Sequence, residues 1–218
     1  MIFRGKSLQN NLKVETISKA TEFVFLGLEN KHHTHQTTIR VKWIAPLMNW
    51  YKVNSNGSSL GNLGLAGKGG MIRNDRGEWI RGYVRAIGST TSATVELWAL
   101  RDGIRSCIAL NLQAVVFELD AKLVIDLLSK EEKSMNGNEI IMVDCKEGLQ
   151  RIPQVRIQHF YREANKCVDA LARRGTFLPQ DFVLFLELPS NVSLLLRLDV
   201  VGTLHDCSVS LAAPLFWF

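Results

Sequence analysis

The sequence predicts an α/β domain built on one mixed five-stranded sheet with helices on both faces. Three observations lead to this prediction. Three alternating segments joined by short turns come first, and after residue 90 the apolar residues recur at the helical period of about 3.6. A later strand–helix–strand unit then requires a right-handed crossover between parallel strands. We therefore expect strands one to three to pair antiparallel, and strands four and five to run parallel to strand one.

Alternation and turn chemistry define the first three strands. The segment WYKVNS (50–55) alternates and runs into a turn rich in glycine and serine. LAGKGGMIRN (65–74) and WIRGYVRAI (79–87) follow, joined by the hairpin-type turn DRGE (75–78). We interpret the glycines of the second strand as positions of close packing or of substrate approach. Turns this short imply an antiparallel meander.

The second half of the chain alternates helices with strands. Thr91 or Ser92 is expected to cap a first helix within residues 90–110, where Val95 and Trp98 recur at helical spacing. The remaining predicted elements are a buried strand at 114–120, helices at 121–130 and 139–152, a strand at 154–161, and a helix at 164–175 that ends at Gly175.

We divide the chain into three parts. Residues 1–42 are polar and mixed in character and are expected to form a flexible N-terminal extension. Residues 43–175 are expected to form the domain, and residues 176–218 a leucine-rich C-terminal tail. The sequence leaves open whether this tail packs on the domain. Three histidines of the extension could bind a metal, but a solvated loop is favoured because no cysteine or acidic partner lies near them: His32, His33 and His35.

The composition is that of an ordinary globular protein, with 46% hydrophobic and 22% charged residues. The net charge of +5 is compatible with a polyanionic partner without requiring one. Four scattered cysteines form no C-x-x-C pair, so we expect reduced thiols, no zinc site and an intracellular location, nuclear or cytoplasmic. No apolar run reaches the roughly 18 residues of a membrane span. The oligomeric state stays open.

Three carboxylates and one amide are expected to meet at one end of the sheet. Strand one ends near Asn56 and strand four at Asp120, and neighbouring strands lie about 4.8 Å apart. The first helix carries Glu96 and the last helix carries Asp169 toward the same place. Each acid also has a purely structural interpretation, as a dipole-stabilising, capping or solvated helix residue. Their joint arrangement favours a functional site.

Four motifs fit one known family in order and in spacing. They are NSNGSS (54–59), where that family has an Asn-x-Asp-Gly-Ser pattern, VELWAL (95–100), FELDA (117–121) and YREANKCVDALARRG (161–175). With these motifs, residues 43–175 resemble the ribonuclease H type 1 domain. The resemblance is greatest to the plant retroelement-derived branch, in which the domain follows a reverse transcriptase.

The resemblance implies a nucleic-acid-binding endonuclease that cuts the RNA strand of RNA–DNA hybrids with two Mg²⁺ ions. The family's catalytic positions fall on Asn56, Glu96, Asp120 and Asp169, of which the three acids would be metal ligands. His159 lies near the place where some relatives keep a proton-shuttling histidine. Asn56 departs from the family pattern, because an amide has no charge and only one of its terminal atoms is an acceptor. We therefore expect weakened two-metal binding and hybrid cleavage well below that of an active relative.

Contacts to nucleic acid are expected from polar groups on the first strand and beside the last helix: Asn54, Ser58, Arg162, Asn165 and Lys166. The alternative is a catalytically inactive module of a decayed retroelement, which binds nucleic acid or protein. Deamidation at the Asn56–Gly57 step, which would create an Asp, is a further hypothesis. A nucleotide-binding enzyme is disfavoured, because GLAGKGG (64–70) lacks the spacing of a phosphate loop.

Overall fold

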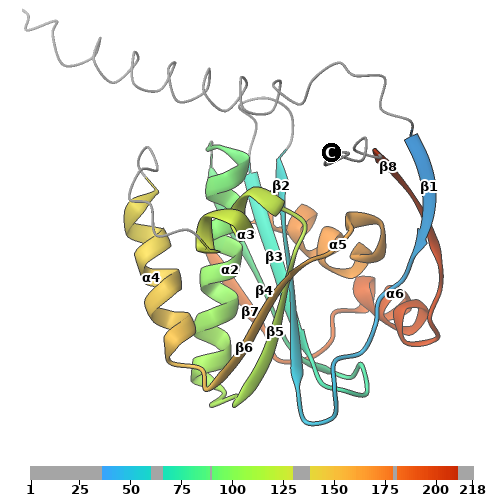
Figure 1. Cartoon of the computed structure of the whole chain (residues 1–218), viewed down its shortest axis with the longest axis horizontal. Coiled ribbons are helices and arrows are strands. Elements are labelled where there is room, and N and C mark those ends of the chain that lie inside the picture. Colours follow the sequence, from blue (N-terminus) through green and yellow to red (C-terminus); the bar gives the residue numbers. More distant parts are fainter. Residues whose placement is uncertain (1–35, 60–65, 89, 130–137, 179–180, 211–218) are drawn as a thin grey trace, which may run out of the picture. The chain divides into compact units, whose positions relative to one another are not determined.

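A computed structural model describes residues 36–59, 66–88, 90–129, 138–178 and 181–210 (Figure 1). Residues 39–207 form one compact unit, and the described residues 36–38 and 208–210 fall outside it. His32, His33 and His35 lie outside the described residues. No helix in the described part of the chain is long and apolar enough to cross a membrane.

The predicted mixed sheet is confirmed, and it carries one further strand. Its strand order is β6-β5-β2-β3-β4-β7. The strands are β2 (Tyr51–Ser59), β3 (Ala66–Arg73), β4 (Trp79–Gly88), β5 (Ala114–Leu119), β6 (Gln154–His159) and β7 (Phe182–Phe185). β2, β3 and β4 pair antiparallel, whereas β5 is parallel to β2 and β6 is parallel to β5.

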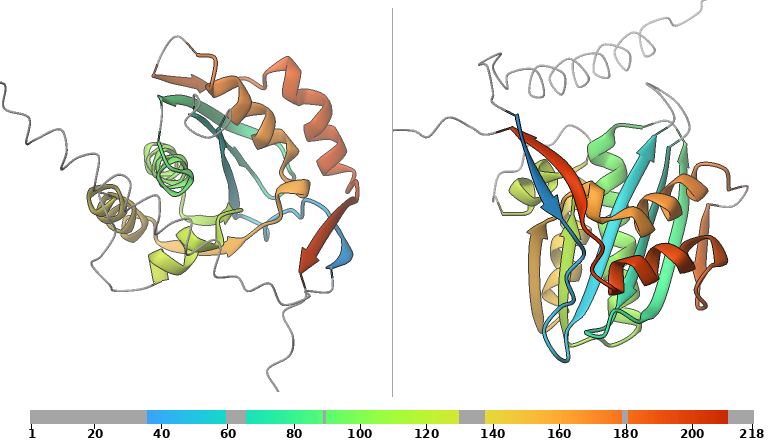
Figure 2. Two further views of the ribbon diagram at one scale, coloured as in Figure 1. Left: turned by 90° about the horizontal axis from the view of Figure 1, so that it is seen from above. Right: turned by 90° about the vertical axis from the view of Figure 1, so that its right-hand side faces the viewer.

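Helices cover both faces of the sheet, as Figure 2 shows. One face carries α2 (Ser92–Ala109), α3 (Lys122–Ser129) and α4 (Glu139–Gln150), and the other carries α5 (Lys166–Gly175) and α6 (Ser190–Val200). The side chain of Thr91 caps α2 by accepting a hydrogen bond from the backbone nitrogen of Thr94 at 3.3 Å. A short 3₁₀ turn, η1 (Arg162–Ala164), leads into α5.

Two apolar clusters hold the layers together. Val53, Leu97, Leu100, Ile104 and Phe117 belong to the larger cluster, which joins the sheet to α2 and its neighbours. Met71, Val84, Val168, Leu171 and Leu196 belong to the second cluster, which joins the opposite face to α5 and α6.

Glycine in β3 permits the close approach of α5. A Cβ atom on Gly67 or Gly69 would lie 2.3–2.5 Å from backbone atoms of α5 or of the residue after it. This geometry agrees with the interpretation of the glycine run as a site of close packing.

The C-terminal tail is packed where the structure describes it. β7 pairs antiparallel with β4 and extends the sheet. Asp199 in α6 forms a buried ion pair with Arg73 of β3 at 2.8 Å. α6 is thereby fastened to the sheet by a pair of charges as well as by apolar contacts.

Two further strands were not predicted. β1 (Gln36–Val41) lies within the stretch expected to be flexible, and it pairs with β8 (His205–Ser210) in a separate two-stranded sheet. All four cysteines are free and buried, as expected for reduced thiols.

Candidate functional site

The register of the central strands places Asn56 and Asp120 at the same edge of the sheet. β2 and β5 are parallel neighbours, with Asn54 opposite Glu118. Asn56 and Asp120 each follow two residues later, so Asn56 lies just beyond the part of β2 that pairs with β5, and Asp120 directly follows the carboxyl end of β5. This is the edge at which open α/β sheets bind ligands.

Glu96 approaches this edge from the first turns of α2. Its side chain is buried, and its Oε1 atom accepts a hydrogen bond from the backbone nitrogen of Gly57 at 2.7 Å. Burial and the charge of Asp120 raise the pKa of Glu96 to about 8. Its Oε2 atom is buried and has no hydrogen-bond partner among the described residues. An unsatisfied carboxylate oxygen of this kind is suited to a proton donor or a cation.

Asp169, in the first turn of α5, is surrounded by donors. Its Oδ1 atom accepts hydrogen bonds from the amide Nδ2 of Asn56 at 3.3 Å and from Arg162 at 2.7 Å. Its Oδ2 atom pairs with Arg173 at 2.9 Å. The carboxylate is therefore compensated by two guanidinium groups and one amide.

Asp120 completes the group. Burial raises the pKa of Asp120, the nearby positive charges of Arg162 and His159 lower it, and the charge of Asp169 raises it. Asn56, Glu96, Asp120 and Asp169 therefore form one cluster. His159 is exposed at the end of β6, and its ring meets the ring of Tyr161 edge-on with the centroids 5.1 Å apart.

The cluster is not a ready-made metal cage. Among the described residues, no three His, Cys, Asp or Glu side chains are arranged to hold a metal ion. Both carboxylate oxygens of Asp169, which a cation would use, are already held by Arg162, Arg173 and the amide of Asn56.

The residues expected to contact nucleic acid differ in their exposure to solvent. Arg162 and Lys166 are exposed beside the cluster, and Ser58 is buried. Asn165 is buried, and its Nδ2 atom donates to the carbonyl oxygen of Ser55 at 3.5 Å, so it shapes the turn before α5.

Asn54 requires a correction, because it is fully buried and cannot reach a ligand on the surface. It donates to Glu118 at 2.7 Å and accepts from Trp43 and Arg73. Its hydrogen bonds belong to the interior of the domain.

Lys68, a buried lysine whose charge acts on Glu96, was not predicted from the sequence. Lys68 of β3 pairs with Asp102 of α2 at 2.6 Å and donates to the carbonyl oxygen of Trp98. Burial lowers the pKa of Lys68 to about 7 although Asp102 opposes the shift, and the charge of Lys68 lowers the pKa of Glu96. The one signal in the sequence was a charged residue inside a glycine-rich strand.

The part of the chain that carries the cluster also matches a known protein family. Residues 54–175, more than half of the chain, match the family described as reverse transcriptase-like. This chain belongs to that family. The assignment confirms the resemblance to ribonuclease H drawn from the motifs.

A relative from a plant supports the assignment to the reverse transcriptase-like family. A protein of Arabidopsis thaliana, named as a candidate ribonuclease H protein, is 33% identical over 171 residues. The match covers 78% of this chain but only 28% of that protein.

Solved structures show the same fold. The N-terminal RNase H domain of a Mycobacterium tuberculosis protein matches with a TM-score of 0.54, 22% identity, and coverage of 58% of this chain and 93% of that chain. RNase H1 of Halobacterium salinarum matches with a TM-score of 0.53, 23% identity, and coverage of 58% and 96%. A compost-derived RNase H1 solved in complex with an RNA/DNA hybrid matches with a TM-score of 0.51, 21% identity, and the same two coverages.

Proposed function

We propose that this reverse transcriptase-like domain binds RNA–DNA hybrids and that Asn56 strongly reduces its metal-dependent cleavage of the RNA strand. Binding is supported by the family, by a neighbour of the same fold solved with a hybrid, and by the exposed basic residues beside the cluster. The observation that carries the reduced cleavage is the hydrogen bond from Asn56 to Asp169.

The residues of the cluster fit a divalent cation only in part. The buried, unpartnered Oε2 atom of Glu96, close to the charge of Asp120, suits a hard cation such as Mg²⁺. Asp169 would be the third ligand, but its oxygens are already held by Arg162 and Arg173. A bound Mg²⁺ would polarise the scissile phosphate and activate a water molecule.

Asn56 works against this cation in two ways. Compared with an aspartate, it removes one negative charge from the cluster. Its NH₂ group also donates a hydrogen bond to Asp169 where an aspartate would offer an oxygen to the metal. An aspartate at position 56 would restore both the charge and the oxygen. The chain therefore stabilises its own acidic cluster with internal donors, at the expense of metal affinity.

Other groups of the chain have separate roles in this proposal. Glu96 holds a proton until a cation displaces it, because the pKa of Glu96 is raised to about 8. His159 is exposed next to Asp120, where it is available to exchange a proton with a bound substrate. Arg162 and Lys166 contribute positive charge for the phosphates.

The test is a hybrid-cleavage assay with Mg²⁺ on the wild type, on Asn56→Asp and on Asn191→Asp. Asn191 is exposed in α6 and controls for the general effect of changing Asn to Asp. We expect Asn56→Asp to cleave at least about 100-fold faster than the wild type, which corresponds to about 2.7 kcal/mol of barrier.

Two results bear on the proposal differently. Equal, substantial cleavage by the wild type and Asn56→Asp would refute the role of residue 56. Hybrid binding without cleavage by either protein would favour the second candidate, a non-catalytic binding module, which the compensated carboxylate of Asp169 also supports.

A further inference from the structure

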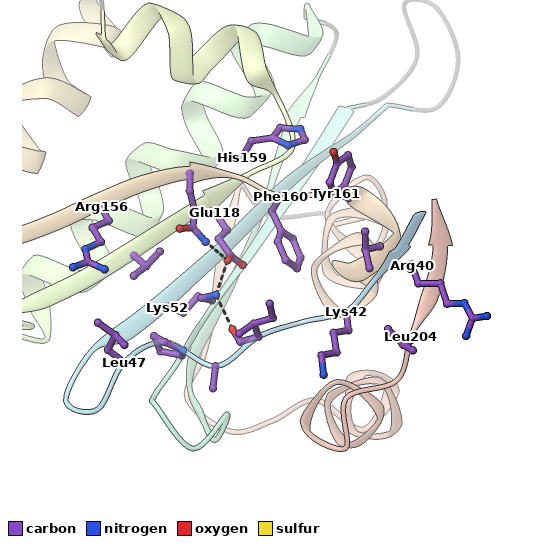
Figure 3. Close-up of a pocket in the computed structure, with 16 residues that line it drawn as sticks. Arg40, Lys42, Leu47, Lys52, Glu118, Arg156, His159, Phe160, Tyr161 and Leu204 are labelled. Atoms are coloured by element: carbon purple, nitrogen blue, oxygen red, sulfur yellow. Dashed lines mark hydrogen bonds and ion pairs between the residues drawn. The ribbon is translucent and has the colours of Figure 1, made fainter. Parts of the chain in front are cut away.

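A cavity of about 550 Å³ lies on the face of the sheet formed by β5 and β6, and His159 is among the residues that line it (Figure 3). One side is made by the chain segment that leads from β1 into β2, including Lys42 and Ile44, and by Leu204. These residues lie outside the region matched to the family. The volume is in the range of sites that bind small molecules or parts of larger ones, about 300–1,000 Å³.

The walls of the cavity are apolar and partly aromatic. Val116, Ile44 and Leu47 line it, together with Phe160 and Tyr161, which follow β6. Figure 3 shows Phe160 between the end of β6 and the segment that carries Lys42. Flat apolar groups could insert between such side chains.

The floor of the cavity is electrically neutral. Lys52 pairs with Glu118 at 2.5 Å and also donates to the carbonyl oxygen of Ile44 at 2.7 Å. Glu118 accepts two further hydrogen bonds, from Gln158 and Asn54, each at 2.7 Å. The carboxylate is thus fully used inside the protein and offers nothing to a cationic ligand.

The rim of the cavity is positive. Arg40, Lys42 and Arg156 are exposed lining residues, and Glu118 is the single acidic side chain among the described residues that line the cavity. His159 lines the cavity as well, and its charge also acts on Asp120. His159 is therefore a neighbour of both the cavity and the candidate site, and the positive lining of the cavity is complementary to an anion.

We propose that this cavity holds unpaired nucleotides of a strand that continues beyond a bound hybrid. The proposal rests on the proposed function. Bases would stack against Phe160 and Tyr161 while phosphates contact Lys42 and Arg156, which is the combination that binds single-stranded nucleic acid. A duplex keeps its bases covered, so apolar walls would gain nothing from it. The segment around Lys42 thus adds a single-strand site to the hybrid-binding fold.

The test compares a blunt hybrid with hybrids that carry an unpaired extension on either strand and at either end, measured by fluorescence anisotropy in EDTA. The cavity variant is Lys42→Gln/Arg156→Gln. The control, Arg76→Gln/Arg105→Gln, removes two charges from exposed side chains of the β3–β4 turn and of α2. Lys42→Glu serves as a second cavity variant, because Arg156 also stacks on Trp50 at 4.7 Å and its loss could affect folding.

We expect the wild type to bind at least one extended hybrid about tenfold more tightly than the blunt one, with a salt slope steeper by about 1.4 for two single-strand phosphate contacts. Both cavity variants should lose this gain and keep their affinity for the blunt hybrid, whereas the control double variant should keep the gain. An extension built from abasic nucleotides should recover only part of it.

Other outcomes separate the two proposals. Binding of the blunt hybrid with no gain from any extension, or a gain that persists in both cavity variants, overturns the single-strand site alone. Failure to bind any hybrid overturns the proposed function and this inference together. If the protein binds an extended hybrid through the cavity but does not bind the blunt hybrid, the single-strand site is supported and the proposed function is contradicted. Preference for an acidic, aromatic peptide over every extension would identify a protein-docking site instead.

Discussion

The side-chain amide of Asn56 donates a hydrogen bond to Oδ1 of Asp169 over 3.3 Å, joining residues 113 positions apart in the sequence. A carboxylate at position 56 would repel Asp169, whereas the amide attracts it. The same atom pair thus explains both how the acidic cluster is held together and why its affinity for metal should be low.

Replacing Asn56 with Asp should destabilise the metal-free protein. The variant exchanges a hydrogen bond for a repulsive pair of charges, for which we expect a loss of about 1–2 kcal/mol in the free energy of unfolding. Mg²⁺ should recover the loss by binding the folded state. Thermal unfolding in EDTA and in Mg²⁺ measures both effects, with Asn191→Asp as the control. A variant as stable as the wild type in EDTA would argue against the repulsion.

Stability should depend on pH through Glu96. The pKa of Glu96 is raised from 4.5 to about 8 in the folded protein, so the folded state binds more protons than the unfolded state between these values. The contribution of Glu96 to stability is therefore fully present below about pH 4.5 and is lost as the pH rises through about 8.

Glu96→Gln tests this pH dependence because glutamine does not titrate. We expect the variant to be more stable than the wild type by on the order of 2 kcal/mol at about pH 9, and to show no such advantage at about pH 4. Urea unfolding at the two pH values gives the difference. Glu139→Gln, an exposed change in the first turn of α4, is the control for the general effect of changing Glu to Gln. An advantage of Glu96→Gln that is equal at both pH values would contradict the assignment.

The tail beyond the family region should be required for stability. Asp199→Ala leaves the guanidinium of Arg73 buried without its carboxylate partner, which costs about 3 kcal/mol or more. The exposed pair Arg76–Glu78 provides the matched control, and Glu78→Ala should cost far less stability than Asp199→Ala because solvent screens this pair. Chemical denaturation measures both, and similar losses for the two variants would contradict this role of α6.

Residue 56 should remain an amide in the folded protein. Deamidation at an Asn–Gly step requires the nitrogen of Gly57 to attack the side chain of Asn56. In the structure Asn56 is buried in the ladder of β2, and the Gly57 nitrogen donates to Glu96. Peptide mass analysis after long incubation at neutral pH should show the amide intact in the folded protein, with faster conversion in urea. Equal conversion in both conditions would favour the deamidation hypothesis.

Much of the fold was predictable because its signals are local. The periodicity of β2 to β6 and the turn chemistry between them specify which segments pair, and Thr91 specifies where α2 begins. β7 and α6 were not assigned, because a four-residue strand and a helix fastened through Arg73 and Asp199 depend on partners far away in the sequence.

The sequence was enough to predict which residues meet at the candidate site, but not which ion pairs surround them. Parallel pairing of β2 and β5 is enough to bring Asn56 and Asp120 together. The ion pairs of Asp169 with Arg162 and Arg173, and the burial of Lys68 near Glu96, arise from tertiary packing and leave no pattern in the sequence. Asn54 was predicted wrongly for a related reason. A polar residue on a strand was expected to contact a ligand at the surface, but its hydrogen bonds are inside the domain.

Calorimetric titration of Mg²⁺ into the wild type and into Asn56→Asp, at one pH and in the same buffer, is the most direct measurement. The variant is predicted to bind Mg²⁺ at least about tenfold more tightly, or about 1.4 kcal/mol in free energy. Equal affinities in two correctly folded proteins would contradict the claim that the amide of residue 56 governs this site.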